Sequence, residues 1–448
     1  ILNSSFSILH SSFSILHSPH VAAMSFSLFR IPSFAFQSTE VTNQLRDLLQ
    51  EPAVKRAVQY LEETADQTTR DLITVNEIPA PPFKEHQRAM YVLQRFREYG
   101  LIHAHIDEEG NVLGVFPGVN DPDGTGPFLA LAAHIDSVFP EGTDVTVHER
   151  DGRLFAPGIG DNASGLTGVL TLARCFTQVP LKTKQSILFV GTVGEEGPGN
   201  LRGVRYLFQE NPYGKQITEF IAYDGPGIER ITHQALGSRR YEVKFEGPGG
   251  HSWGDYGIVN PVHALGKFIH YMTSYHPPTI PRTTYSISVI EGGTSVNTIP
   301  RSARCEVDLR SVSEGELDHL EHHLREAVKQ AWEEEERAAA LSRTRLKLTV
   351  TPMGNRPSGE TPTTTRLVRL AQAATMICGC RPLLDCSSTD SNLPISLSIP
   401  AITIGAGGRC NGCHTLDEWY EPTERELSLQ RGILLLLGLV GLAEKTSG

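Results

Sequence analysis

Two kinds of apolar spacing run along the chain and predict its elements. Residues 43–100 place apolar side chains at helical intervals, and Gly100 ends that run where a helix C-cap favours glycine. Short apolar stretches bounded by Gly, Pro and Asp follow, as is typical of buried strands, and residues 163–176 between them have helical periodicity. Strands alternating with helices predict an α/β domain with a largely parallel sheet flanked by helices. The predicted strands cover residues 112–116, 128–133, 186–193 and 220–223.

A second unit begins near Gly237, where the strands alternate apolar and polar residues as half-exposed strands do. Its elements follow the order β-α-β-β-α-β, which is the ferredoxin-like signature. After Gly354 the first pattern resumes, so we predict a small α+β unit inserted into the larger α/β domain. The inserted elements are expected at residues 239–246, 261–275, 284–291, 301–310, 314–341 and 346–351, and the later ones at 364–377, 401–405 and 424–442.

Length and composition agree with this division. A chain of 448 residues exceeds the roughly 250–300 residues that one core supports. We predict that the larger α/β domain is in two parts, 41–236 and 353–448, on either side of the inserted unit at 237–352. No apolar run reaches the roughly 20 residues that a membrane-spanning helix needs. The longest run, 433–442, is expected to be a buried helix.

Charge and cysteine content exclude some partners. The net charge of −11 argues against a nucleic-acid binder, which needs a basic surface. Seven cysteines in a long chain form no compact disulfide framework and favour reduced thiols in a cytoplasmic protein. We therefore predict a cytoplasmic protein with neither a nucleic-acid nor a membrane partner.

The start of the chain stands apart from the fold. Residues 5–11 and 12–18 are identical copies of SFSILHS, and the first methionine is Met24. The segment lacks the basic start and clean apolar core of a secretory signal. Residues 1–40 are therefore predicted to be a leader that is disordered or not native.

Acidic and imidazole residues follow the predicted strands or precede a helix at five points. In open α/β sheets, ligands bind beyond the carboxyl ends of the strands, so these side chains are expected to converge. Any one point alone is weak, because an H-x-D triplet is usually incidental and adjacent glutamates usually form a solvated pair. The prediction depends on all five occurring together. They are His134 with Asp136, Asp161, Glu195 with Glu196, Asp224, and His414.

This set suits a pair of divalent ions. Two ions roughly 3.5–4 Å apart need a bridging carboxylate and further His and carboxylate ligands on each ion. Asp161 is the predicted bridge, with His134 and Asp224 on one ion and Glu196 and His414 on the other. Zinc suits these ligands, and manganese and cobalt also accept them.

Two carboxylates remain outside the ligand set. Asp136, two residues past His134, is placed to hold the imidazole and fix its tautomer. Glu195 is free to take a proton from the attacking water and pass it to the leaving amine. Both residues are therefore predicted to be catalytic rather than metal ligands.

The chain resembles the co-catalytic di-zinc peptidases and deacylases that include peptidase T, carnosinase and the aminoacylases. The resemblance covers roughly residues 43–445 and implies the same five metal ligands, a catalytic α/β domain and an inserted ferredoxin-like lid. The motifs that carry it are HIDSV (134–138), GIGDNASG (158–165), GEEG (194–197), YDGPG (223–227), GGHSWGDYG (249–257), SVNTIP (295–300), DLRS (308–311) and CHTLDEW (413–419).

The resemblance adds residues that spacing does not nominate. His251 matches a lid histidine that, in dimers of this family, reaches the partner's active site and stabilises the oxyanion. Asn297 and Arg310 match lid residues that grip a substrate carboxylate. A homodimer through the lid is therefore implied. Without the resemblance, His251 reads as a turn histidine and Arg310 as a strand-end charge.

Two segments leave alternatives open. Cys410-Asn-Gly-Cys413-His414 fits the C-x-x-C-H pattern of haem attachment, but haem needs export and an axial pocket, and His414 belongs to the metal set. The two cysteines could instead form a disulfide or tune the loop that carries His414. Residues 387–391, SSTDS, replace the glycines of many family members in the segment that lines the substrate-terminus pocket.

The predicted function is metal-dependent cleavage of an amide bond, with a water activated between two metal ions. Asp224, rather than Glu, resembles the aminopeptidase and dipeptidase branch, which favours a small peptide as substrate. An N-acyl-amino-acid deacylase is the alternative enzyme. A non-catalytic metal- or peptide-binding relative is the competing class, but it is expected to lack a ligand or the base, and all are present here.

Overall fold

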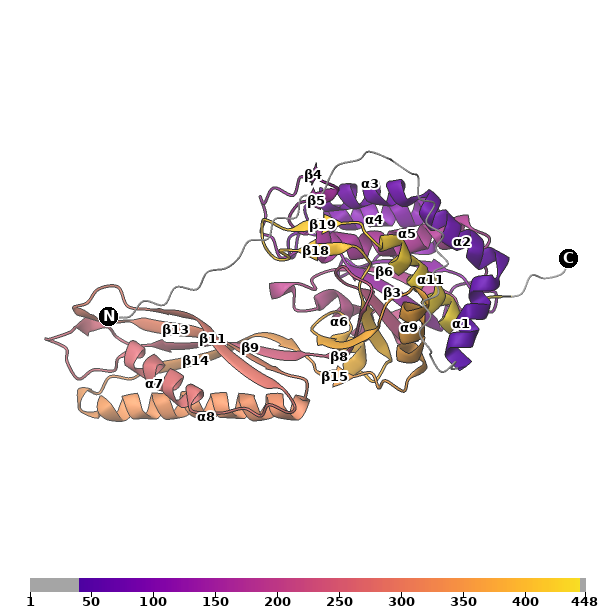
Figure 1. Cartoon of the computed structure of the whole chain (residues 1–448). Helices are drawn as coiled ribbons and strands as arrows, with labels where there is room; N and C mark the ends of the chain where they lie inside the picture. Colours follow the sequence, from indigo (N-terminus) through magenta and orange to yellow (C-terminus); the bar gives the residue numbers. More distant parts are fainter. Residues whose placement is uncertain (1–39, 444–448) are drawn as a thin grey trace, which may run out of the picture.

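The structure is a computed structural model that describes residues 40–443. The leader predicted at 1–40 lies outside the described residues except for Glu40, which begins the first helix. Figure 1 shows two units, an α/β domain and an elongated lid domain that extends away from it. The mixed α/β fold with an inserted ferredoxin-like unit is as predicted.

The helical run before Gly100 consists of four helices. Pro52 begins the second of them at a position where its missing N–H costs no hydrogen bond. Gly100 ends the fourth with a φ of 85°, a left-handed conformation that glycine adopts without strain, so the predicted C-cap is confirmed. The helices are α1 (Glu40–Gln50), α2 (Pro52–Glu63), α3 (Ala65–Asn76) and α4 (His86–Tyr99).

A nine-stranded sheet forms the centre of the α/β domain, in the order β1-β2-β6-β3-β7-β17-β8-β15, with β16 beside β8. Its middle strands β6, β3, β7 and β17 run parallel, whereas β1, β2, β8 and β15 each pair antiparallel with a neighbour, and β16 runs parallel to β8. The largely parallel sheet is therefore confirmed. The strands are β1 (Ile102–Ile106), β2 (Val112–Phe116), β3 (Phe128–His134), β6 (Ser186–Thr192), β7 (Ile217–Tyr223), β8 (Arg230–Ala235), β15 (Gly359–Glu360), β16 (Leu383–Ser387) and β17 (Ala401–Ile404).

Helices cover both faces of this sheet. One apolar core joins the first four helices, α5 (Ser164–Gln178), α9 (Arg366–Ile377) and α11 (Arg425–Val440) to the sheet. A second core on the other face contains residues of α6 (Arg202–Gln209) and α10 (Asn392–Ser396). The apolar run predicted as a buried helix lies in α11, and no helix in the described part of the chain is long and apolar enough to cross a membrane.

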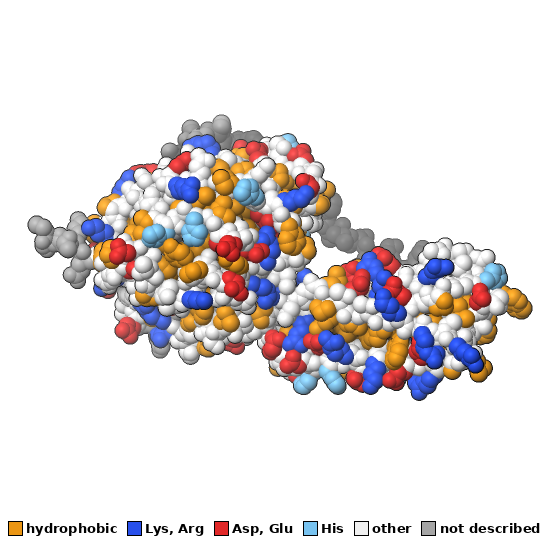
Figure 2. All heavy atoms as spheres, turned by 180° about the vertical axis from the view of Figure 1, so that it is seen from behind, with side chains coloured by type: hydrophobic (Ala, Val, Ile, Leu, Met, Phe, Trp, Pro, Cys, Tyr) orange, Lys and Arg blue, Asp and Glu red, His pale blue; other side chains and the backbone are white. Residues whose placement is uncertain are grey.

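The lid domain is a four-stranded antiparallel sheet in the order β11-β13-β9-β14, with two helices on one face. Alternate residues of β9, such as Tyr241 and Val243, are buried in the core under the helices, and the residues between them belong to the other face. Lysine, arginine and acidic side chains are interspersed over the lid surface (Figure 2). The elements are β9 (Gly237–Glu246), α7 (Pro261–Thr273), β11 (Thr283–Gly292), β13 (Ser302–Ser311), α8 (Glu314–Ala338) and β14 (Lys347–Arg356).

The two ends of the lid sheet have different surroundings. Its base, where β9 begins and β13 and β14 end, adjoins the central sheet, because β8 ends only two residues before β9 begins. At the opposite tip, β10 (Gly250–His251) pairs with β12 (Thr298–Ile299) to form a short ribbon. A strand of ten residues, such as β9, separates tip from base by roughly 30 Å.

A small sheet absent from the sequence prediction links distant parts of the α/β domain. Its four strands join in the order β18-β19-β5-β4. The pairing of β19 with β5 brings the loop that carries His414 beside the turn that carries Asp161. The strands are β4 (His148–Arg150), β5 (Arg153–Phe155), β18 (Arg409–Asn411) and β19 (Trp419–Glu421).

Candidate metal centre

Three of the predicted points meet at the carboxyl edge of the central sheet. His134 is the last residue of β3, Glu195 and Glu196 follow β6, and Asp224 follows β7. Because β3 pairs in parallel with both β6 and β7, the carboxyl ends of these strands lie at one edge. The chain therefore gathers side chains that are up to 90 residues apart in the sequence.

Asp161 lies between the two histidines. Its Oδ1 is 3.2 Å from Nε2 of His134, and its Oδ2 is 3.0 Å from Nε2 of His414. Each carboxylate oxygen of Asp161 therefore faces a different imidazole. This is the arrangement expected of a carboxylate that bridges two ions.

Each histidine faces a second carboxylate as well. Nε2 of His134 is 3.7 Å from Oδ1 of Asp224, and Nε2 of His414 is 3.2 Å from Oε1 of Glu196. The potential ligand atoms of His134, Asp161 and Asp224 lie within 4.8 Å of one another, and so do those of Asp161, Glu196 and His414. The structure thus brings together all five predicted ligands as two groups that share Asp161.

The electrostatics of this edge favour bound cations. Burial lowers the pKa of His134, but hydrogen bonds to surrounding aspartates outweigh it and raise that pKa well above its usual value. Hydrogen bonds to Asp161 and Glu196 raise the pKa of His414 to about 11. Burial raises the pKa of Glu196. The shifts of the two histidines record an excess of clustered negative charge, which divalent cations would neutralise.

Glu418 positions the turn that carries Asp161. It is buried, and its carboxylate accepts hydrogen bonds from the backbone N–H groups of Gly158 (2.8 Å), Gly160 (2.8 Å) and Asp161 (3.0 Å). Burial raises the pKa of Glu418 to about 7 against these three hydrogen bonds. The sequence prediction missed this role, although Glu418 lies within the CHTLDEW motif.

Asp136 lies against His134, as predicted, and also contacts the turn that carries the two glutamates. The Nδ1 atom of His134 lies 3.1 Å from the backbone oxygen of Asp136 and 3.7 Å from its carboxylate. The carboxylate instead accepts hydrogen bonds from the backbone N–H groups of Glu195 (3.0 Å) and Glu196 (2.9 Å). Asp136 therefore orients His134 through its main chain and fixes the turn of the two glutamates through its side chain.

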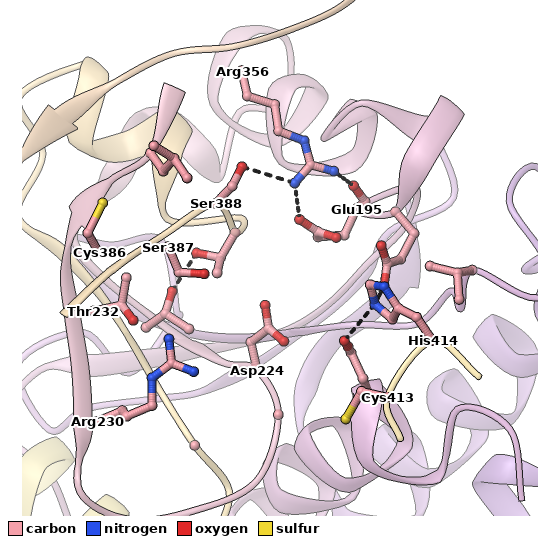
Figure 3. Close-up of a pocket in the computed structure, with 18 of the residues that line it drawn as sticks. Glu195, Asp224, Arg230, Thr232, Arg356, Cys386, Ser387, Ser388, Cys413 and His414 are labelled. Atoms are coloured by element: carbon pink, nitrogen blue, oxygen red, sulfur yellow. Dashed lines mark hydrogen bonds and ion pairs between the residues drawn. The ribbon is translucent and has the colours of Figure 1, made fainter. Parts of the chain in front are cut away.

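Glu195 is paired with an arginine that the sequence did not nominate. Nη1 of Arg356 donates to Oε1 of Glu195 at 2.7 Å and to Oγ of Ser388 at 3.2 Å, and Nη2 donates to the backbone oxygen of Glu195 (Figure 3). Burial raises the pKa of Glu195 well above its usual value, and Arg356 opposes that rise. Ligand atoms of His134, Glu195 and Glu196 also lie within 4.8 Å, but a carboxylate engaged by a buried guanidinium is a poor metal ligand.

A cavity of about 790 Å³ opens beside these residues. Asp161, Glu195 and Asp224 line it, and so do four arginines, one of which is the predicted Arg310. Residues 387–389 of the segment SSTDS also line it. The four arginines are Arg230, Arg240, Arg310 and Arg356.

Two predicted site residues of the lid lie away from the cavity. His251 is in the ribbon at the lid tip, where its Nδ1 accepts hydrogen bonds from the backbone N–H groups of Trp253 (3.1 Å) and Gly254 (3.2 Å). Asn297 accepts a hydrogen bond from the backbone N–H of Ser252 through its backbone oxygen. Neither His251 nor Asn297 is among the residues that line the cavity. Within a single chain, the structure does not bring these two residues to the metal ligands.

The thiols of Cys410 and Cys413 lie together next to His414. Their sulfur atoms are 2.9 Å apart, and Cys413 lines the cavity. Ligand atoms of Cys410, Cys413 and Glu418 lie within 4.8 Å, but the Glu418 carboxylate is already engaged by three backbone N–H groups. All seven cysteines are free thiols, as the sequence predicted. His414 faces Asp161 and Glu196, which argues against a haem ligand role.

Two histidines that face a shared aspartate, beside the carboxyl edge of the parallel sheet, define a candidate dinuclear metal centre. Residues 130–441 match peptidase family M20/M25/M40, and the chain belongs to this family. The predicted resemblance to the di-zinc peptidases and deacylases is thereby confirmed.

The chain spans about half the length of the curated relatives that it matches in sequence. The chain is 31% identical over 179 residues to a Pyrococcus abyssi protein provisionally named LysW-lysine/LysW-ornithine hydrolase, covering 40% of this chain and 46% of that protein. It is 26% identical over 230 residues to succinyl-diaminopimelate desuccinylase of Paraburkholderia xenovorans, covering 46% and 59%.

Solved structures match over nearly their whole length. Aminopeptidase PepT from Bacillus cereus superposes with a TM-score of 0.68 at 19% identity, covering 84% of this chain and 98% of that one. Human carnosine dipeptidase 1 superposes with a TM-score of 0.65 at 13% identity, covering 86% and 99%. At these identities, the likeness establishes the fold.

Proposed function

We propose that the protein is a dinuclear metallopeptidase that hydrolyses an amide bond of a small peptide, as a dipeptidase, tripeptidase or aminopeptidase. The observation that supports this most is the position of Asp161 between His134 and His414, with Glu195 held outside both groups by Arg356. Family membership and the metal-ligating groups point to the same chemistry.

The donor set fits two divalent ions. His134, Asp161 and Asp224 would hold one, and Asp161, Glu196 and His414 the other. Imidazole nitrogens with carboxylate oxygens suit zinc, and manganese or cobalt is compatible. When bound, the ions would polarise the amide carbonyl and lower the pKa of the attacking water.

Side chains of the protein transfer the proton, position the proposed base and bind the substrate. Glu195 accepts the proton of the water and delivers it to the leaving nitrogen, so the C–N bond breaks as the amine becomes neutral. Asp136 keeps the glutamate turn in place through its two backbone hydrogen bonds. Arg310, at the cavity wall, binds a substrate carboxylate.

His251 and Asn297 would act at the active site of the other subunit in a homodimer. In one chain the ribbon that carries them lies at the far end of the lid, and a ten-residue strand separates it from the cavity. We propose that the lid of a second copy brings His251 to the oxyanion and Asn297 to the substrate carboxylate. We also propose a cytoplasmic location, because all seven cysteines are free thiols.

N-acyl-amino-acid deacylation is the second candidate. The curated relative from Paraburkholderia removes a succinyl group according to its name, whereas the solved structures include an aminopeptidase and a dipeptidase. Both reactions cleave an amide through the same residues. A non-catalytic metal- or peptide-binding protein is a different class, which the presence of all five ligands and Glu195 disfavours.

The test is turnover by metal-reconstituted protein on free dipeptides, tripeptides and N-acetyl amino acids. Hydrolysis of peptides supports the first proposal, and hydrolysis of N-acetyl amino acids alone supports the second. The control is Glu195→Gln, which removes the base and should lower kcat by about 10²-fold or more. Metal-loaded protein that hydrolyses none of the panel would favour the binding protein.

A further inference from the structure

The base of the lid sheet collects arginines at the cavity. Arg240 lies on β9, Arg310 near the end of β13, and Arg356 at the end of β14. In the register of the sheet, Arg310 and Arg356 both pair with Ser238, so they stand in one row on either side of β9. Because residues two apart on a strand share a face, Arg240 lies on the same face as Ser238. The strand pairing therefore brings three guanidinium groups to one wall.

One carboxylate orients two of these arginines. Oδ1 of Asp308 accepts a hydrogen bond from Nε of Arg240 at 3.3 Å, and Oδ2 accepts one from Nε of Arg310 at 2.6 Å. Within residues 40–443, no hydrogen bond is made by the Nη atoms of either arginine. Both side chains are partly exposed, at 32% and 38%. Two positive charges thus share one negative charge, and both guanidinium forks remain available.

Other arginines around this site are each paired with a carboxylate. Arg356 is paired with Glu195 at 2.7 Å, and Arg230 forms an ion pair with Asp385. Arg239, the neighbour of Arg240 on the opposite face, binds three acidic side chains of the α8 region at 2.6–2.7 Å. Arg240 and Arg310 therefore differ from these neighbouring arginines, because their Nη donors face the cavity without a carboxylate partner among the described residues.

We infer that the enzyme prefers amides whose leaving amino acid is acidic, aspartate or glutamate. Its α-carboxylate binds the fork of Arg310, and its side-chain carboxylate binds the fork of Arg240. Arg240 and Arg310 occupy diagonal positions on adjacent strands, roughly 7–8 Å apart at the backbone, a span that long side chains can close. This inference rests on the proposed amide hydrolysis and adds the class of leaving group.

The test uses substrate pairs that differ only in one charge: Ala-Glu with Ala-Gln, and N-acetyl-glutamate with N-acetyl-glutamine. For zinc-loaded wild type, kcat/KM should be about 10- to 100-fold higher for the acidic member, the ratio expected for a charge-assisted hydrogen bond. Arg240→Gln should lower kcat/KM for the acidic member to that of the neutral one. The control Lys244→Gln, on the same face but outside the cavity wall, should keep the preference.

A binding measurement separates this inference from the proposed reaction. Titration calorimetry of free glutamate and glutamine into zinc-loaded protein should show about tenfold tighter binding of glutamate, lost in Arg240→Gln. That result without any turnover would refute the proposed hydrolysis but keep the acidic site. Equal kcat/KM within each pair, or equal affinity for the two amino acids, would overturn the inference. A preference that survives in Arg240→Gln would overturn the role of Arg240.

Discussion

Arg356, the last residue of β14, donates a hydrogen bond of 2.7 Å to the carboxylate of Glu195 at the carboxyl edge of the central sheet. Both side chains are buried, with 7% and 6% of their surface exposed. The contact joins the base of the lid sheet to the proposed catalytic base. The position of the lid base therefore bears on the orientation of Glu195 through this one buried contact.

Removal of Arg356 should cost stability because it leaves the buried carboxyl group of Glu195 without its partner. We expect Arg356→Met to lower the free energy of unfolding of the metal-free protein by about 3 kcal/mol. In a Glu195→Gln background, the same substitution should cost less than about 1 kcal/mol, since no charge is left unpaired. Urea denaturation of the four proteins gives the coupling energy. Equal losses in the two backgrounds would show that Arg356 acts through packing alone.

The pH dependence of stability should contain a contribution from Asp390. Its carboxyl group is buried and accepts a hydrogen bond from Thr192, and burial raises its pKa from 3.8 to about 6. Between these two values, the folded state holds a proton that the unfolded state has lost. Stability from this group therefore falls as pH rises from about 4 to about 6, by up to about 3 kcal/mol.

Asp390→Asn removes that titration. Relative to wild type, the free energy of unfolding of the metal-free variant should rise by about 3 kcal/mol between pH 4 and pH 7. Urea denaturation of both proteins in the presence of a chelator measures this difference. A difference between variant and wild type that stays constant over this range would refute the assignment.

Sequence patterns predict the candidate metal ligands because each adjoins a recognisable element. His134, Glu196 and Asp224 end apolar runs long enough to identify as strands, and parallel strands bring their carboxyl ends to one edge. The β-α-β-β-α-β order of the lid was likewise readable from its alternating strands. At these residues the local sequence pattern and the place in the fold agree, so the candidate ligands could be predicted from the sequence.

The role of Arg356 could not be predicted from the sequence in this way. The predicted strand ended at residue 351, since Pro352 and Gly354 are unfavourable in a strand interior. In the structure, a register shift between these two residues lets β14 continue to Arg356. The contact with Glu195 joins residues 161 apart and depends on that shift. No local periodicity carries such information.

The small sheet escaped prediction for a related reason. Strands of three residues, such as β5 and β19, are too short to display a period of two. Yet their pairing places Glu418 under the turn that carries Asp161. The contact of Glu418 with the Asp161 turn therefore depends on tertiary strand pairing, which local sequence does not reveal.

His251 provides a test of the proposed dimer. A protein with Glu195→Gln and one with His251→Ala should each lose most activity as homodimers. Mixed and allowed to exchange, they should recover about a quarter of wild-type activity, because half of the dimers would contain one site with both intact residues. Activity is measured after equimolar mixing, and each protein mixed with itself is the control. Failure to recover activity while mixed dimers form would refute the contribution of His251 across the dimer.

The central claim is that His134, Asp161, Glu196, Asp224 and His414 hold two ions while Glu195 holds none. The most direct measurement is the metal content per chain of dialysed wild type, Glu195→Gln, Glu196→Gln and Asp161→Asn, by inductively coupled plasma mass spectrometry. We predict about two ions for wild type and for Glu195→Gln, about one for Glu196→Gln, and fewer than one for Asp161→Asn, which lacks the shared ligand. Equal metal loss in Glu195→Gln and Glu196→Gln, or a single ion in wild type, would contradict the account.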